Sequence, residues 1–334
     1  METTKVVAQV SETLSSISES ERQQLIKELE ALLQMPSKEE EPDNCPRCDC
    51  DRIVRKGRTK TGQRYLCKGC GRSFGMNTGK VLGSSKLPLS TWREYIKCFI
   101  DRVPLRRAAV RCQVSLKTSF FMRHRILELV EKARPKTSVG LGNAAQVDET
   151  FIRFNFKGTT PPGREPYKRG KSMATKCRSK NHMCVVMGVT NTGSTFYQIA
   201  GGGNMTINMA RRALSGVVRN GSHIITDKAS CYPKAVHDLG ATHTAYHSKD
   251  ERGELAQINA LHSRTKRFLR LFGGVASKYL PRYLSWMLWL DSNAENETMN
   301  TVVEGTYTVS RSKMTGDQLP PLDHLTRQTV AHAI

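Results

Sequence analysis

The stretch QVDETFIRFNF, residues 146–156, decides how the central part of this chain folds. Its β-branched and aromatic residues are of the types enriched in strands, and two adjacent acids, Asp148 and Glu149, lie near its start. Neighbouring side chains of a strand point to opposite faces of a sheet, so we expect Asp148 to share a face with Gln146 and Glu149 to share the other with Val147. The two carboxylates are therefore predicted to have different roles.

The residues around this strand, from Ala144 to about Asp291, have a mixed α/β pattern. Apolar and β-branched runs predict strands at residues 146–156, 182–190, 194–200, 223–226 and 242–246. Helices are predicted at residues 205–218, with Asn204 as the N-cap, and at residues 254–271. This order indicates an RNase H-like domain with a mixed five-stranded sheet, although other α+β folds permit the same order.

Two acids are placed where a sheet would present them to a ligand. Asp148 lies in the first strand, and Asp227 closes the apolar strand of SHIITD. Phosphodiester chemistry with two metal ions needs oxygen ligands on rigid elements that hold the cations ~4 Å apart, and magnesium takes such hard ligands. A surface role for Asp148 and an N-cap role for Asp227, before a helix at residues 229–239, are the structural alternatives.

A third ligand would come from the helix GELAQINALHSRTKRFLRLF, residues 253–272. At helical spacing, Asn259, His262 and Lys266 fall on one face. Asn259 offers a neutral oxygen to a metal, and Lys266 is suited to a phosphate or a DNA end. His262 has a packing role as its alternative. Glu254 faces elsewhere and is the reserve ligand.

Two pairs of cysteines have the spacing of a structural zinc site. Cys45 and Cys48 form one CxxC pair, Cys67 and Cys70 the other, and the segment between them reads as a basic hairpin. Tetrahedral zinc would hold the four thiolates of such a ribbon together. Cys50 is an alternative to Cys48. The ribbon would contact DNA or a partner protein, with DNA favoured by its charge.

A basic helical segment follows at residues 88–134. Its part RRAAVRCQVSLKTSFFMRHRI, residues 106–126, is typical of a helix-turn-helix, with Ser115 as the N-cap of the second helix. In such modules the second helix enters the major groove, so we expect Arg123 and Arg125 to contact DNA. A three-helix core without a DNA role is the alternative.

The charge balance of the whole chain indicates the partner. Its 334 residues include 52 Lys and Arg against 30 Asp and Glu, a formal charge of +22. Such an excess predicts a polyanion, with double-stranded DNA foremost. A glycine- and proline-containing basic insertion at residues 157–181, with Lys168, Arg169 and Lys171, would contact the backbone. No membrane partner is expected because no apolar run approaches a span of ~20 residues. The first residues do not resemble a secretory signal, and we expect a reducing, cytoplasmic compartment.

These patterns predict a multidomain chain. Residues 1–42 would be a helical extension and linker, with a helix at residues 11–34 capped by Ser18 or Ser20; residues 43–78 a zinc ribbon; residues 86–136 the helix-turn-helix; residues 144–291 the catalytic domain; and residues 292–334 a tail.

Taken together, the ribbon, the helix-turn-helix and three further motifs resemble the insertion-sequence transposases with a DD(E/N)K catalytic set and an ISXO-like transposase domain. The motifs are VDET (147–150), ITDKASCY (225–232) and INALHSRTKRFLRLFGGVASKYLPRYLSWMLW (258–289). The resemblance covers about residues 45–290. It implies an RNase H-like enzyme that uses magnesium or manganese to cut and join DNA strands at terminal inverted repeats, as a homodimer or a higher oligomer on DNA.

The resemblance also assigns the site. It implies that Asp148 and Asp227 bind the metals, that Asn259 stands where most relatives have Glu, and that Lys266 contacts the transposon end. His262 matches the His of this branch. Glu149 would then point away from Asp148, as a structural or hydrogen-bonding residue. A zinc-ribbon transcription regulator without catalysis, and a plain RNase H-like nuclease, are the alternative functions.

Overall fold

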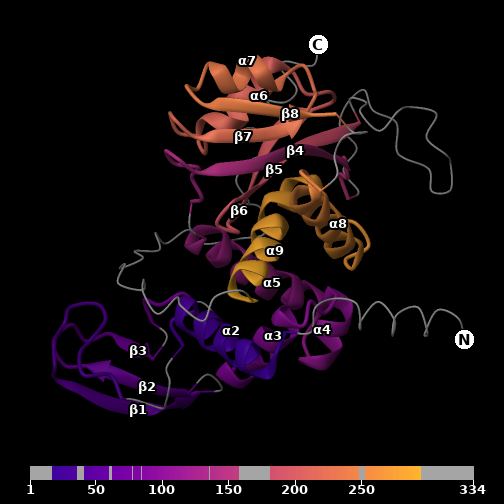
Figure 1. Cartoon of the computed structure of the whole chain (residues 1–334). Helices are drawn as coiled ribbons and strands as arrows, with labels where there is room; N and C mark the ends of the chain where they lie inside the picture. The colour runs from indigo at the N-terminus through magenta and orange to yellow at the C-terminus, as the bar shows by residue number, and fades with distance from the viewer. Residues whose placement is uncertain are drawn as a thin grey trace, which may run out of the picture. The chain divides into compact units, whose positions relative to one another are not determined.

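The structure, a computed structural model, describes residues 17–35, 41–59, 62–76, 78–83, 85–134, 136–157, 181–247 and 253–294. These residues form two compact units, one before residue 134 and one over residues 134–292. Figure 1 shows the elements of each. No helix in the described ranges is long and apolar enough to cross a membrane.

The first unit begins with helix α2 (Glu19–Leu32), and residues 11–16 of the predicted helix lie outside the described residues. Ser18 is its N-cap, as expected, and forms a capping box in which the Ser18 hydroxyl accepts from the backbone of Glu21 and the Glu21 carboxylate accepts from the backbone of Ser18. Such a box satisfies two backbone donors that the first turn would leave without partners. The apolar side of the helix, with Leu25 and Leu29 fully buried, packs against helices α3 and α5.

A small sheet carries the two cysteine pairs. Strands β1 (Ile53–Thr59) and β2 (Gly62–Cys67) form the predicted antiparallel hairpin, and β3 (Ser73–Gly75) adds an edge strand that the sequence did not predict. Its apolar core is limited to Tyr65, Phe74 and two of the cysteines.

The three predicted helical blocks are α3 (Leu89–Ile100), α4 (Leu105–Arg111) and α5 (Leu116–Ala133). Ser115 caps α5 by accepting from the backbone N–H of Thr118 at 3.0 Å. The chain turns between α4 and α5 with Gln113 at a positive φ of 53°.

The second unit contains the expected mixed five-stranded sheet, in the order β6-β5-β4-β7-β8. Its strands are β4 (Ala144–Arg153), β5 (His182–Thr190), β6 (Thr195–Gly202), β7 (His223–Asp227) and β8 (Thr242–Tyr246). The first three pair antiparallel, whereas β7 runs parallel to both β4 and β8. The carboxyl ends of β4 and β7 therefore lie on the same edge.

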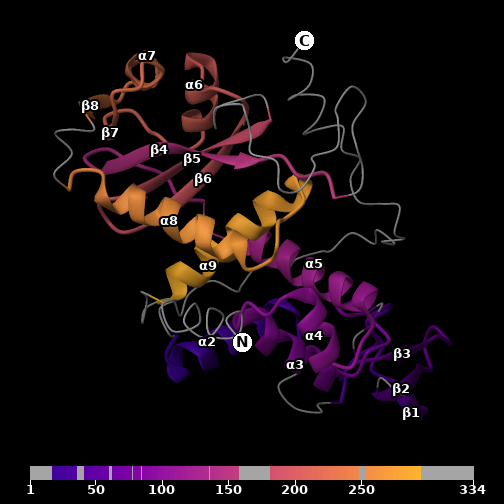
Figure 2. The same ribbon diagram turned by 90° about the vertical axis from the view of Figure 1, so that its right-hand side faces the viewer.

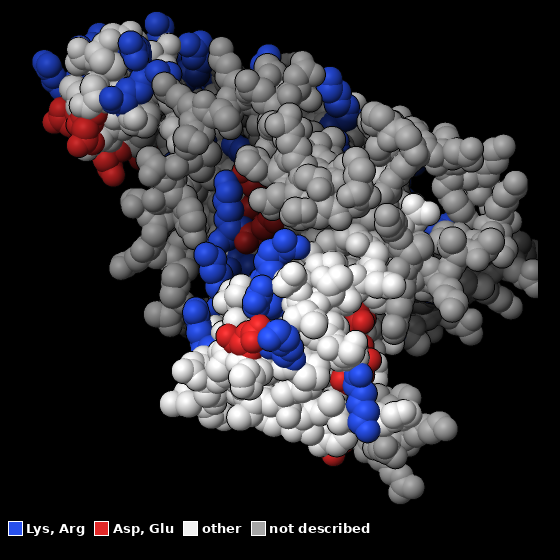
Figure 3. Space-filling model, turned by 90° about the horizontal axis from the view of Figure 1, so that it is seen from above, with Lys and Arg blue, Asp and Glu red and all other residues white. Residues whose placement is uncertain are grey.

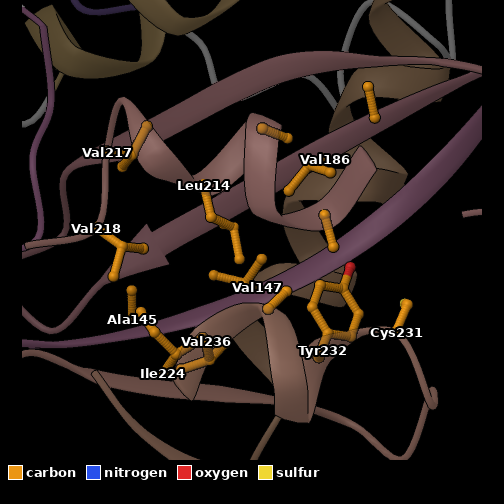
Figure 4. Packing of buried hydrophobic residues seen from close by; sticks show 14 of the residues in the cluster. Ala145, Val147, Val186, Leu214, Val217, Val218, Ile224, Cys231, Tyr232 and Val236 are labelled. Atoms are coloured by element: carbon orange, nitrogen blue, oxygen red, sulfur yellow. The ribbon is translucent and has the colours of Figure 1, made fainter. Parts of the chain in front are cut away.

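Helices cover both faces of this sheet (Figures 1 and 2). One face carries α6 (Ile207–Ser215) and α7 (Tyr232–His237), and the main core lies between them and the sheet, as Figure 4 shows. The other face carries α8 (Ala256–Arg270), which contacts β4 and β5. A short 3-10 turn, η1 (Ser277–Tyr279), leads into α9 (Leu280–Ala294). Trp286 of α9 packs edge-on against Phe268 of α8, with ring centroids 5.2 Å apart.

Several element boundaries differ from the predicted ones, and two of these differences have a clear local cause. Strand β4 ends at Arg153 rather than at residue 156, because the backbone N–H of Asn155 donates to the Ser277 hydroxyl and its backbone oxygen accepts from the Ser277 N–H, instead of pairing with a strand. Helix α6 begins at Ile207 and is capped by Thr206 rather than by Asn204, since the Thr206 hydroxyl accepts from Met209.

Candidate functional site

Asp148 and Asp227 lie together at the edge of the sheet where β7 ends. The parallel ladder of β4 and β7 pairs Gln146 with Ile225, and the same register carried two residues further brings Asp148 level with Asp227. Oxygen atoms of the two carboxylates lie within 4.8 Å of each other. Asp227 does not cap helix α7, which begins at Tyr232; instead its Oδ1 accepts from the backbone N–H of Ala229 at 3.0 Å. The turn after β7 thus fixes Asp227.

Glu149 belongs to the same cluster, which corrects the expectation that it points away. One oxygen each from Asp148, Glu149 and Asp227 lies within 4.8 Å of the other two. The strand does place Asp148 and Glu149 on opposite faces. Glu149 is paired with Val186, which belongs to the core under α6 and α7, and Asp148 is paired with a residue on the α8 face.

The two faces converge here because the β4–β7 ladder stops before Asp148. Beyond Gln146 no further pairing joins β4 to β7 on that side, and both carboxylates lie close to Asp227 at the end of β7. The Tyr232 hydroxyl donates to Glu149 Oε2 at 2.7 Å, so the predicted hydrogen-bonding role of Glu149 is confirmed. Alternation along the strand revealed the faces, but not the point at which the ladder ends.

Helix α8 approaches Asp148 from the other face. Its first turn is attached to β4 by a hydrogen bond from the backbone N–H of Ile258 to Gln146 Oε1 at 3.1 Å. His262, one turn later, places Nδ1 3.6 Å from Asp148 Oδ2. Burial of the ring, and then the positive charge of Lys266, lower the pKa of His262 to about 4. The imidazole is therefore neutral at pH 7, and its contact with Asp148 is not an ion pair.

The other predicted members of the site are exposed. Asn259 and Lys266 lie on the solvent side of α8, and Lys266 is near enough to His262 to act on its pKa. Glu254 lies before the helix and is exposed. Among the described residues, it is not part of the group that Asp148 and Asp227 form with a third acid. The structure brings Glu149 to that place instead.

The acidic cluster fits a divalent cation by its chemistry and spacing. Magnesium and manganese take carboxylate oxygens, and with metal–oxygen distances of about 2.1 Å the ligands of an octahedron lie about 3.0 to 4.2 Å apart. Oxygens already within 4.8 Å of one another would reach those distances by small side-chain rotations.

The four predicted zinc ligands also come together. The sulfur atoms of Cys45, Cys48, Cys67 and Cys70 lie within 4.8 Å of one another. Sγ of Cys45 is 3.9 Å from that of Cys70, and Sγ of Cys48 is 3.6 Å from that of Cys67. Zinc–sulfur distances of about 2.3 Å place the sulfurs of a tetrahedron about 3.8 Å apart. The cluster therefore fits zinc, with Cys48 rather than Cys50 as its fourth ligand.

One predicted DNA contact in the helical unit was wrong. Arg123 is fully buried in the three-helix core, where its guanidinium donates to the backbone oxygen of Val103 at 2.6 Å. Its guanidinium also lies 5.9 Å from the ring centre of Tyr95 and 5.7 Å from that of Phe99. It packs the helices together and is not available to a phosphate.

Arg125 is half-buried and donates to the backbone oxygen of Val81 at 2.8 Å, so part of its guanidinium is engaged within the unit. The residues on the exposed side of this helix pair are different ones. They include Arg106, Arg107, Val110, Lys117 and Phe120. Lys168, Arg169 and Lys171 of the basic insertion lie outside the described residues.

Comparisons with known proteins find similarity over the part of the chain that carries the acidic cluster. Residues 140–290 match the family model described as the ISXO2-like transposase domain. A protein of the transposable element ISH50 of Halobacterium salinarum, itself uncharacterised, is 29% identical over 135 residues. The match covers 40% of this chain and 44% of that protein, so this chain spans less than half of its length.

Solved structures give only weak similarity. An intasome of simian T-cell lymphotropic virus is 14% identical with a TM-score of 0.29, over 66% of this chain and 80% of that one. A pre-cleavage Mos1 transpososome is 11% identical with a TM-score of 0.20, over 58% and 75%. Scores this low say nothing about fold or partners. The family match is different, because it covers the sheet, the acidic cluster and α8. Residues 140–290 therefore match the ISXO2-like transposase domain, and together with the ISH50 relative this similarity supports an insertion-sequence transposase.

Proposed function

We propose that this chain is a DNA transposase that cuts and joins DNA strands at the terminal inverted repeats of its insertion sequence. The observation that carries the proposal is the meeting of Asp148 and Asp227 at one edge of the sheet, inside the transposase domain. A protein that only bound DNA would have no use for a group of acids in a chain with a formal charge of +22.

In this proposal the domain is RNase H-like and the acids hold magnesium or manganese. When bound, such ions polarise the phosphate and lower the pKa of an attacking water. Asp148 and Asp227 provide the charged ligands. His262 is neutral and buried, and it keeps Asp148 oriented from the α8 side. Asn259 offers a neutral oxygen from the exposed face of α8, and Lys266 contacts the DNA end.

The remaining parts would recognise DNA. The zinc ribbon of residues 43–78 and the helix-turn-helix of residues 86–136 would bind the repeats, after the extension of residues 1–42. The insertion at residues 157–181, within the catalytic domain of residues 144–291, would contact the backbone, and residues 292–334 follow as a tail. Figure 3 shows Lys and Arg side chains, with acidic ones beside some of them, among the described residues of this view, which fits a phosphate-rich partner. The two ends of the insertion sequence must be held together, so we expect at least a homodimer on DNA.

The test is incubation of the purified full-length protein with magnesium and the DNA that flanks its own coding sequence. We expect strand breaks at the repeat ends and joined products. Both should be lost in Asp148→Asn and Asp227→Asn, which keep the side-chain shape and remove the charge. Asp238→Asn is the matched control: Asp238 lies in the same domain, after α7, and pairs with Arg211 at 3.4 Å.

The outcomes separate the alternatives. Breaks without joining would indicate a plain nuclease. Specific binding without breaks, in magnesium and in manganese, would indicate a transcription regulator. Cleavage and joining that persist in both cluster variants would refute the assignment of the site.

A further inference from the structure

We propose that Glu149 is a third carboxylate ligand of the divalent cation held by Asp148 and Asp227, and that Tyr232 is the positioning residue that keeps it there. This inference rests on the metal site of the proposed function and deepens it, because it places the third acid on the sheet rather than on α8. By the motif resemblance, the third ligand would be Asn259.

The charge and spacing of the ligands favour Glu149. Asn259 contributes a neutral oxygen, whereas Glu149 contributes a negative charge, and the affinity of an oxygen site for a divalent cation rises with the number of charged ligands. Among the Asp, Glu, His and Cys side chains of the described residues, Glu149 is the one that lies with an oxygen within 4.8 Å of both other acids. Three carboxylates this close repel one another, and a divalent cation between them relieves that repulsion.

A buried polar side chain, His262, lies beside the cluster. The His262 side chain is only 9% exposed, and its ring faces Asp148. Its Nε2 has no hydrogen-bond partner among the described residues. A buried polar atom without a partner costs free energy and needs an explanation such as an ion or a water. The ring atom that faces the cluster is Nδ1, which at 3.6 Å from Asp148 Oδ2 is beyond hydrogen-bond length, and a water of a hydrated cation would bridge the two.

Glu149 is held by a hydrogen bond from Tyr232. Tyr232 is fully buried, and Figure 4 shows its hydroxyl pointing from α7 toward strand β4. That hydroxyl donates to Glu149 Oε2 at 2.7 Å. A carboxylate has about four lone-pair sites, so it binds a cation while it accepts this hydrogen bond.

Tyr232 acts through Glu149, to which its hydroxyl donates a hydrogen bond. Hydrogen bonds of this kind orient metal ligands, and their loss typically lowers metal affinity about 10- to 100-fold.

The experiment measures manganese binding to the full-length protein without DNA, from the loss of the electron paramagnetic resonance signal of free Mn²⁺. The cysteine cluster does not interfere, because thiolates prefer softer ions. We expect Glu149→Gln to weaken binding about 100-fold and Tyr232→Phe about 10-fold. Asn259→Ala should change it much less than Glu149→Gln.

Tyr197→Phe is the matched control for Tyr232→Phe. Tyr197 is another buried tyrosine of the same unit, and its hydroxyl donates to the backbone oxygen of Pro281 at 2.7 Å. Both changes remove one buried hydroxyl, but only the Tyr232 change should weaken Mn²⁺ binding. If Glu149→Gln does not fold, Glu149→Asp keeps the charge and shortens the side chain, and it should also weaken binding.

The two proposals fail differently. Binding that is lost in Asp148→Asn but unchanged in Glu149→Gln or Glu149→Asp would overturn this inference and leave the proposed function intact. Unchanged binding in Tyr232→Phe, with a loss in Glu149→Gln, would remove the positioning role alone. A wild-type protein that binds no Mn²⁺, or binds it equally in Asp148→Asn, would overturn the metal site of the proposed function and this inference together.

Discussion

The substitution Arg123→Ala separates a structural role from a DNA-binding one. Arg123 lies fully buried in the three-helix core, and its charged donor reaches the backbone oxygen of Val103. A basic residue on the second helix of a helix-turn-helix would ordinarily be expected to contact DNA. The structure instead predicts that its removal loosens the helices before it affects any partner.

The size of the effect follows from the contacts. A hydrogen bond from a charged group is worth about 1.5–3 kcal/mol, and contacts with the rings of Tyr95 and Phe99 add about 0.5–1 kcal/mol each. Removing a buried charge returns part of its desolvation cost. We expect a net loss of about 2–4 kcal/mol in the local stability of α5.

Amide hydrogen exchange in the full-length chain measures this loss without requiring the whole molecule to unfold in one step. At about 1.4 kcal/mol per tenfold change, protected amides of α5 should exchange about 30- to 700-fold faster in Arg123→Ala. Lys117→Ala is the control, since Lys117 is exposed on the first turn of the same helix. It should leave exchange unchanged. Unchanged exchange in Arg123→Ala, together with weaker DNA binding, would refute the buried role.

Three further changes test other parts of the structure. Cys67→Ser should reduce the zinc content from about one ion per chain to a small fraction, measured by metal analysis after dialysis, and should make the small sheet sensitive to proteolysis. Gln146→Ala leaves the backbone N–H of Ile258 without its acceptor, so α8 should lose about 1–3 kcal/mol of local stability in amide exchange; slow exchange that persists would contradict this tether. Gly188→Ala should destabilise the second unit, because a Cβ there would lie 2.2 Å from the ring of Phe196; an unchanged urea midpoint would contradict the packing.

Much of the fold was predictable because its signals are local. The second strand, residues 182–190, is an uninterrupted run of apolar and small residues after its first His, and the structure buries every residue of it. Ser18 and Ser115 were predictable as caps, since their side chains satisfy backbone donors of the next turn. The cysteine spacing was equally informative, because zinc imposes the same geometry on any chain that presents four thiolates.

The errors arose where a residue's role depends on distant partners. Charge suggested that Arg123 is exposed, but it lies at helical spacing from Ser119, Ile126 and Leu127, which are all buried. That spacing was visible in the sequence and would have placed Arg123 on the inner side of α5. Charge alone gives no information about which face of a helix is buried.

Glu149 is the opposite case. Its face was predicted correctly from alternation along the strand, yet its carboxylate still joins Asp148 and Asp227. The cause is the end of the β4–β7 ladder at Gln146 and Ile225, together with the Tyr232 hydroxyl on the far side. Neither is visible in the local sequence, because ladder length and the approach of α7 are set by tertiary packing.

The most direct test of the account is to locate the cation itself. Fe²⁺ bound in place of magnesium, in the presence of ascorbate and peroxide, generates radicals that cut the polypeptide beside its own ligands. We predict cuts next to Asp148 and Glu149 and next to Asp227, which magnesium suppresses and which Asp148→Asn abolishes. Cuts confined to other segments, or cuts that persist unchanged in that variant, would contradict a metal site at this edge of the sheet.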